Sequence, residues 1–380
     1  MFHFYVFCVG VLTFLGIDSS VVTMTRCKIL YQMLKNQAEA SSVLQVWFSS
    51  AWTSKTQVEF QKALTNLLES NEMDFDEMDL LLHWNESKID AEAAKKIWSS
   101  PFLKNECPDH HFQACTNLKY ECDRVDYARY LFTGVIFADE AEIKYGNVTM
   151  FSIPENLLAK KVENENFFHT FNFNHSEFVY KGSLMKSVKG FMMGKTEELL
   201  ELVNRGKVKM DFKILTIGLD MWSLVQLFRF VQGDPRTMDW SNISDFMSKE
   251  DFFKMVRHYK SKKTIHYVHT VNWGQYYKGA SVWDYRDKMP VIRAAMNSFN
   301  LCHRELILAS ENYSQMWANT LRFMNYLDII QWNLSKKCKD KYLNHFFGEK
   351  DVNLIIDPPN VGHWWFKRLH SVIYGRFSFV

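Results

Sequence analysis

The chain has 380 residues, enough for two or three domains of ordinary size and a large buried core. Apolar residues make up 47% of it and Pro and Gly only 7 and 15 residues, which excludes a disordered or linker-rich chain. The formal charge of +2 predicts no general attraction to nucleic acid or to an anionic membrane.

The N-terminus contains an apolar run from Phe2 to Ile17 without Asp, Glu, Lys or Arg. It has the length of a secretory signal peptide and is shorter than the roughly 20 apolar residues that a membrane-spanning helix needs. We therefore expect residues 1–20 to be a signal peptide and the protein to be secreted and extracellular, without a stable membrane span. An uncleaved anchor and a buried N-terminal strand are the alternatives, because no Lys or Arg precedes the run.

Two further features are typical of secreted proteins. The chain carries six sequons for N-glycosylation, at Asn85, Asn147, Asn174, Asn242, Asn312 and Asn333. Without the leader it retains an even number of cysteines, which permits three disulfide bonds among Cys27, Cys107, Cys115, Cys122, Cys302 and Cys338. The shortest loops would join Cys302 to Cys338 and close one pair within the group Cys107, Cys115 and Cys122. The spacing within that group does not suit zinc, so no metal is expected.

In chain order, the hydrophobic pattern first predicts two helices between Ile29 and Ser70, joined near Trp52, with Thr53 or Ser54 as a cap. A strand at Asp76–Leu82 and a short helix at Asp90–Trp98 follow. Runs rich in aromatic and β-branched residues then predict an antiparallel meander, in the segments His111–Cys122, Tyr127–Phe137 and Glu142–Ile153.

Two later blocks share an order of strand, helix and two strands. The first begins at Phe167 and continues with a helix at Ser183–Arg205 and strands at Lys207–Ile217 and Met221–Val231. The second has a strand at Thr264–Tyr277, a helix at Ser281–Asn297 and strands at Leu301–Ser310 and Gln315–Trp332. The motif HTFNF at His169–Phe173 matches HTVNW at His269–Trp273, which indicates duplicated domains.

Two segments resemble nuclear transport factor 2-like domains of secreted nematode proteins. The segment EFQKALTNLLESNEMDFDEMDLLLHWNESKIDAE at Glu59–Glu92 is similar to that family's helical pair and first strand, and DPPNVGHWWFKRLHSV at Asp357–Val372 is similar to its final strand. The resemblance implies an α+β fold of tandem cone-like domains, each with helices packed on a curved antiparallel sheet. The expected domains are residues 27–158, the shorter repeat-like block 159–240, and 241–380.

A cone-like domain leaves a pocket at its open end, and the ligand-pocket candidates are His83, Trp84, His169, His269 and Trp273. A catalytic pair is not expected. The histidines of the two repeated motifs, His169 and His269, and the Asn three residues after each of them would face opposite sides of a strand. No carboxylate pair has a telling spacing, and no phosphate-binding, nucleotide-binding or zincin motif occurs. The sequence thus predicts neither catalytic residues nor a cofactor.

These features favour a non-catalytic binding or interaction module that recognises another extracellular protein or an apolar small molecule. The alternative is an apolar-ligand carrier or an isomerase-like enzyme that uses the pocket of one domain. Nucleic acid is not expected as a partner, because the basic runs at Lys260–Lys263 and Lys336–Lys341 are short and flanked by acids. A pocket filled by the protein's own aromatic side chains would favour the module.

Overall fold

The computed structural model describes residues 2–8, 11–70, 72–103, 121–154, 182–215, 221–231, 235–240, 243–270, 290, 340–355 and 373–380. The chain divides into two compact units. Unit 1 comprises Met1–Phe7, Pro108–Val125 and Ile217–Val380, and unit 2 comprises Cys8–Cys107 and Asp126–Thr216. These boundaries differ from the predicted blocks, because unit 1 combines both ends of the chain with an internal segment.

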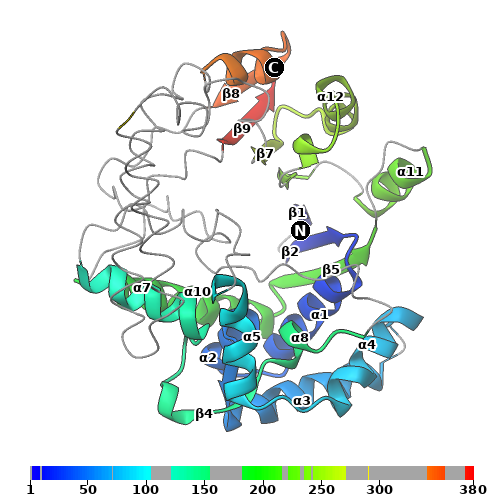
Figure 1. The fold of residues 1–380 in the computed structure, drawn as a ribbon. Coiled ribbons are helices and arrows are strands. Elements are labelled where there is room, and N and C mark those ends of the chain that lie inside the picture. The colour runs from blue at the N-terminus through cyan, green and yellow to red at the C-terminus, as the bar shows by residue number, and fades with distance from the viewer. Residues whose placement is uncertain are drawn as a thin grey trace. The chain divides into compact units, whose positions relative to one another are not determined.

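Helices account for most of unit 2 (Figure 1). They are α1 (Val21–Lys35), α2 (Ala40–Phe48), α3 (Ser54–Leu68), α4 (Phe75–Glu86), α5 (Ala91–Leu103), most of α7 (Glu121–Thr133), the 3-10 helix η1 (Glu140–Glu142), α8 (Val148–Phe151) and α10 (Leu184–Asn204). Side-chain caps define several N-termini: Ser20 caps α1, Thr53 caps α3, and Asp74 forms a capping box with Glu77 in α4. The predicted cap at Thr53 is confirmed.

Unit 2 also contains two pairs of strands. The strand β2 (Val11–Asp18) pairs in parallel with β5 (Val208–Ile214), from Leu12 opposite Val208 to Asp18 opposite Ile214. The short strands β3 (Ala51–Thr53) and β4 (Ile143–Gly146) pair antiparallel. Residues 11–18 are therefore a strand here, with Leu15 and Ile17 buried. This matches one alternative for the N-terminal apolar run, and removal of a leader stays a prediction.

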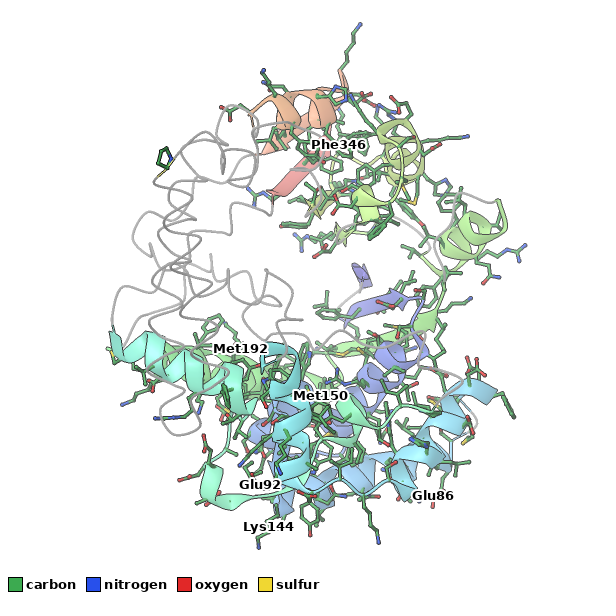
Figure 2. All side chains as sticks on the ribbon, viewed as in Figure 1. Glu86, Glu92, Lys144, Met150, Met192 and Phe346 are labelled. Carbon is green, nitrogen blue, oxygen red and sulfur yellow. The ribbon has the colours of Figure 1, made fainter. Side chains whose placement is uncertain are left out.

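The core of unit 2 forms where α1 packs against α2, α3, α4, α10 and β5. Large aromatic side chains occupy this core, with Trp52, Phe60 and Trp84 fully buried. Figure 2 places Met150 and Met192 within unit 2, where both are buried. The charged side chains Glu86, Glu92 and Lys144 are exposed, as expected for the polar faces of amphipathic elements.

Unit 1 contains a mixed sheet whose described strands are β1 (Phe2–Cys8), β6 (Thr237–Asp239), β7 (Ile265–Thr270), β8 (Val352–Ile355) and β9 (Ile373–Phe379). The order is β1, β6, β7, β9, β8, with β6 and β7 parallel and the other pairs antiparallel. Its helices are α11 (Met221–Phe230), η3 (Ile243–Asp245), α12 (Lys249–Val256), η4 (Arg257–Tyr259) and residues 340–347.

Aromatic rings fill the interior of unit 1. Phe252 and Phe253 of α12 contact Phe346 and Phe377, with ring centroids 5.6 to 6.5 Å apart. Figure 2 labels Phe346 within this group, on the helix formed by residues 340–347. Such contacts contribute beyond simple burial of apolar surface, so this cluster is the main tie between α12 and the sheet.

The mixed α+β class is confirmed, and the strands form open, curved sheets. The predicted helix at Ser183–Arg205 and strand at Lys207–Ile217 are also confirmed, by α10 and β5. The expectation of purely antiparallel sheets is wrong, because β2–β5 and β6–β7 are parallel.

Three predicted strands are helical over all or most of their length: Asp76–Leu82 lies in α4, Tyr127–Phe137 is helical as far as Thr133, and Met221–Val231 is helical as far as Phe230. In the first, the Asp74 capping box starts α4, and Leu80, Leu81 and Trp84 are buried at helical spacing. Short apolar runs do not distinguish a strand from a buried helix by periodicity alone, which explains these errors. The predicted elements at Phe167, Ser281–Asn297, Leu301–Ser310 and Gln315–Trp332 lie outside the described residues.

Candidate functional site

Of the predicted pocket residues, the structure describes the side chains of His83 and Trp84. His83 is half-buried on helix α4 and not on a strand, and Trp84 is fully buried in the core. His269 belongs to β7, but its side chain lies outside the described part of the structure, as do His169 and Trp273. The prediction that His83 lines the concave face of a sheet is therefore wrong, since α4 starts from a strong cap and continues through it.

His83 instead forms a hydrogen-bonded group with two serines. Its Nε2 lies 2.8 Å from Ser152 Oγ, which lies 2.6 Å from Ser87 Oγ, and Trp84 Nε1 donates to the Ser152 carbonyl at 2.8 Å. A serine beside an imidazole is the start of a nucleophile–base pair. However, the backbone N–H groups of Ser87 and Ser152 donate to the His83 and Val148 carbonyls, so neither can stabilise an oxyanion. The group therefore ties the end of α4 to the segment after α8.

The structure separates the glycosylation candidates. Asn85 is exposed on α4. Asn147 is fully buried, donates to the Val46 and Ser49 carbonyls, and accepts from Thr149. Glycosylation of Asn147 is incompatible with this fold, because the side chain has neither space nor a free hydrogen for a glycan. The remaining candidates are not among the described residues: Asn174, Asn242, Asn312 and Asn333.

The structure describes two of the six cysteines that were predicted to form disulfide bonds. Cys27, half-buried on α1, and Cys122, exposed on α7, are both thiols in this structure. The other candidates lie outside the described residues: Cys107, Cys115, Cys302 and Cys338. The predicted disulfide pattern is therefore not visible in the described part of the chain.

A first pocket in unit 2, the Lys55 pocket, encloses about 500 Å³. Its lining is mainly polar and consists of Glu39, Ser41, Ser42, Gln45, Thr53, Ser54, Lys55, Phe137, Ala138, Ala141, Glu142 and Lys144. Lys55 and Glu39 form an ion pair across it, and their hydrogen bond raises the pKa of Lys55. Two of the charges that line this pocket therefore already neutralise each other.

A second pocket in unit 2, the Lys189 pocket, encloses about 660 Å³ and is lined by residues of α7, α10 and the chain that follows α7. It is lined by Asp126, Arg129, Tyr130, Val135, Ala138, Asp139, Glu140, Ser183, Met185, Lys186 and Lys189. The charged members comprise three acids and three bases. Among the described residues of this pocket, the closest opposite charges are Arg129 Nη1 and Asp126 Oδ1, 3.9 Å apart, so the charges are only loosely paired.

Lys189 differs from the other bases of this pocket because it is half-buried. Within the described residues its amine makes no hydrogen bond or ion pair. Burial lowers the pKa of Lys189, and the charges of Asp126, Asp139 and Glu140 oppose that shift. These acids are thus close enough to act on the amine electrostatically without contacting it.

The wall between the two pockets is a strained loop. Phe137 has a φ of 65°, which is rare for a bulky residue, and Gly134 has a φ of 67°. The loop is fixed on both sides, since Gln45 Nε2 donates to the Phe137 carbonyl at 3.4 Å and the Ile136 N–H donates to Ser49 Oγ at 3.2 Å. Ala138 lines both pockets. Strained backbone of this kind often accompanies functional sites.

Sequence reasoning missed the Lys189 pocket. None of the ligand-pocket candidates named from the sequence lines either pocket. The pocket's own charges come from segments far apart in the chain, so no local spacing connects them. Two of its acids, Asp139 and Glu140, are adjacent in the sequence ADEA at residues 138–141.

Comparisons with known proteins give no relative. No family model matches the chain, and neither the curated proteins nor the solved structures contain a match. In the part of the chain that the structure describes, no helix combines the length and the apolar character needed to cross a membrane. Among the same residues, no cluster of His, Cys, Asp and Glu could hold a metal ion.

Proposed function

We propose that the protein is a secreted glycoprotein that acts as a non-catalytic binding module, and that the Lys189 pocket holds a small polar ligand with an anionic and a cationic group. The observation that carries this proposal is a pocket with charges of both signs around a half-buried amine that has no partner among the described residues. A buried charge without a partner is costly, so a bound anionic group would stabilise it.

The size and polarity of the pocket support this ligand class. About 660 Å³ lies within the ordinary range of small-molecule sites, roughly 300 to 1,000 Å³. The bases Arg129, Lys186 and Lys189 suit a carboxylate, and the acids Asp126 and Asp139 suit an amine.

The alternative of an apolar-ligand carrier or isomerase-like enzyme has less support. Trp52, Trp84, Trp98 and Trp240 are almost completely buried, so these aromatic side chains pack the interior and do not line an open apolar cavity. Charged side chains line both pockets of unit 2.

The relationship to nuclear transport factor 2-like domains, with tandem cone-like domains, is part of this proposal. The helices α1 to α4 of unit 2 support it, since the family begins with helices that pack on a sheet. The parallel pairing of β2 with β5 weighs against it, because a cone of this family is antiparallel.

Thermal unfolding tests the ligand class. We would compare glutamate, which carries both charges, with succinate and putrescine, which carry only one kind. Glutamate should raise the melting temperature most, because it can pair with the bases and with the acids of the pocket. A ligand that binds only the folded state stabilises that state, and the effect grows with the ligand concentration. Lys189→Met should remove the effect, and Lys195→Met, which changes a lysine of the same helix outside the pocket, should retain it. Equal shifts in wild type and Lys189→Met would contradict the proposal.

Secretion is tested separately by the intact mass of the protein from the medium of secreting cells. A mass that falls after deglycosylation supports a secreted glycoprotein. Retention inside the cells without glycan would contradict it.

A further inference from the structure

We propose that Lys189 is a nucleophilic amine that forms a reversible imine with a small carbonyl compound, an α-keto acid, bound in the Lys189 pocket. This inference rests on the proposed function, because it concerns the same pocket. It narrows the ligand with an anionic and a cationic group to one whose carboxylate lies next to a carbonyl group, and it adds a covalent step. Pyruvate serves below as a probe of the carboxylate and carbonyl part alone.

The position of Lys189 suits a nucleophile. It projects from α10 into a cavity of about 660 Å³ and is half-buried. Lys195, on the same helix, forms an ion pair with Glu198 at 3.0 Å, whereas the Lys189 amine has no such partner among the described residues. Burial disfavours the ammonium form, so more of this amine is neutral than of an exposed lysine at the same pH.

The neighbouring groups supply what imine formation needs. The Nζ lone pair of the neutral amine attacks the carbonyl carbon, a C–N bond forms, and the carbonyl π electrons move to oxygen. A proton leaves nitrogen and another reaches oxygen; a carboxylate among Asp126, Asp139 and Glu140 can carry them. A second proton then reaches the hydroxyl oxygen from the same carboxyl group, the nitrogen lone pair forms C=N as the C–O bond breaks, and the oxygen leaves as water, which gives a protonated imine. Hydrolysis reverses every step, so no oxidant or reductant is consumed.

The remaining bases explain why an α-keto acid fits better than a simple aldehyde. Arg129 and Lys186 line the same pocket and carry positive charge. They can bind the carboxylate next to the carbonyl group and hold the carbonyl carbon near Lys189, which turns an encounter into an intramolecular reaction.

The experiment uses the full chain with pyruvate as the probe and sodium cyanoborohydride to reduce any imine to a stable amine. Peptide mass mapping should locate the adduct at Lys189, several-fold above that at any exposed lysine. Lys189→Arg keeps the positive charge but not the nucleophile, so it should lose this adduct. Lys195→Arg, outside the pocket, should retain the adduct at Lys189.

The outcomes separate this inference from the proposed function. An adduct spread evenly over exposed lysines, and unchanged in Lys189→Arg, would overturn the imine. In that case, pyruvate can still raise the melting temperature of wild type more than that of Lys189→Met. This result would mean that the pocket binds the acid without covalent chemistry, and the proposed function would stand. If neither pyruvate nor glutamate shifts the melting temperature, the proposed ligand site fails as well. Melting of Lys189→Arg without ligand checks that this variant folds.

Discussion

Asn147 connects three segments of unit 2 through one buried side chain. Its amide donates to carbonyls at the end of α2, and its carbonyl oxygen caps α8. We expect the folded protein to carry a glycan at the exposed Asn85 and none at Asn147. Peptide mass mapping before and after enzymatic deglycosylation measures both sites. A cooperatively folded protein with Asn147 fully glycosylated would contradict the packing described for this residue.

Lys28 and Glu77 form an ion pair that is largely withdrawn from water. Lys28 Nζ lies 2.6 and 2.7 Å from the two carboxylate oxygens, and the Glu77 side chain is only 2% exposed. Lys28→Met should lower the free energy of unfolding by about 3 kcal/mol, because it leaves a buried carboxylate without its partner. Denaturant unfolding measures the loss.

The double variant Lys28→Met with Glu77→Leu is the control for this prediction. It removes both charges, so most of the lost stability should return, apart from the contribution of the capping box at Asp74. If the double variant is less stable than Lys28→Met alone, the pair does not behave as a buried ion pair.

At the scale of elements, β2 is the feature with the largest consequence for the proposed biology. It pairs with β5 over seven residues, Leu12 to Asp18, and packs beside α1. A chain that begins at residue 21 lacks this strand, so we expect unit 2 to lose stability and the β5 amides to exchange faster with deuterated water. Hydrogen exchange and thermal melting of the shortened chain measure both effects.

The result bears directly on the signal peptide. If a secreted form that begins near residue 20 is as stable as the full chain, β2 is dispensable and removal of a leader is compatible with the fold. If the shortened chain unfolds, a secreted protein must retain residues 11–18, and the apolar run serves as a strand.

At the scale of a whole unit, unit 1 should be sensitive to acid. His266 is fully buried and accepts a hydrogen bond from Trp240 Nε1 at 3.1 Å, so the neutral form fits this site. Burial lowers the pKa of His266 from 6.5 to about 4, and a weaker interaction with the backbone of Tyr259 opposes the shift. Between these two pH values the unfolded chain binds a proton that the folded chain does not.

The stability of unit 1 should therefore fall as the pH decreases from 6.5 to about 4, by about 3 kcal/mol in total. Denaturant unfolding at a series of pH values measures the slope. His266→Gln keeps an acceptor for Trp240 but does not titrate, so its profile should be flat in this range. A wild-type profile that is equally flat would contradict the prediction.

A second loss should begin below pH 4.5 in the same unit. Lys249 and Arg257 donate to Glu349, Arg257 and Lys260 donate to Asp351, and these bonds lower the pKa of both carboxylates. Groups with lowered pKa stabilise the folded state above their unfolded pKa, and this contribution is lost as the pH falls toward their folded pKa. Asp351→Asn should reduce this second loss of stability but not the loss due to His266. An unchanged stability profile of the variant below pH 4.5 would contradict the prediction.

The sequence by itself determined the features that depend on neighbours along the chain. It predicted the helix at Ser183–Arg205, the strand at Lys207–Ile217 and the cap at Thr53, because periodicity and capping are local. It also determined the mixed α+β class. It could not assign Asp76–Leu82, where a short apolar run suits either a strand or a buried helix.

Tertiary structure decided which residues meet. It buried Asn147 and Trp84, gave β2 a parallel partner almost two hundred residues later in the chain, and assembled the Lys189 pocket from α7, α10 and the loop between α7 and β4. Each of these depends on contacts between distant segments, and residue spacing along one segment carries no information about them. The chemistry proposed for Lys189 therefore follows from the packing of α10 and not from any motif around this residue.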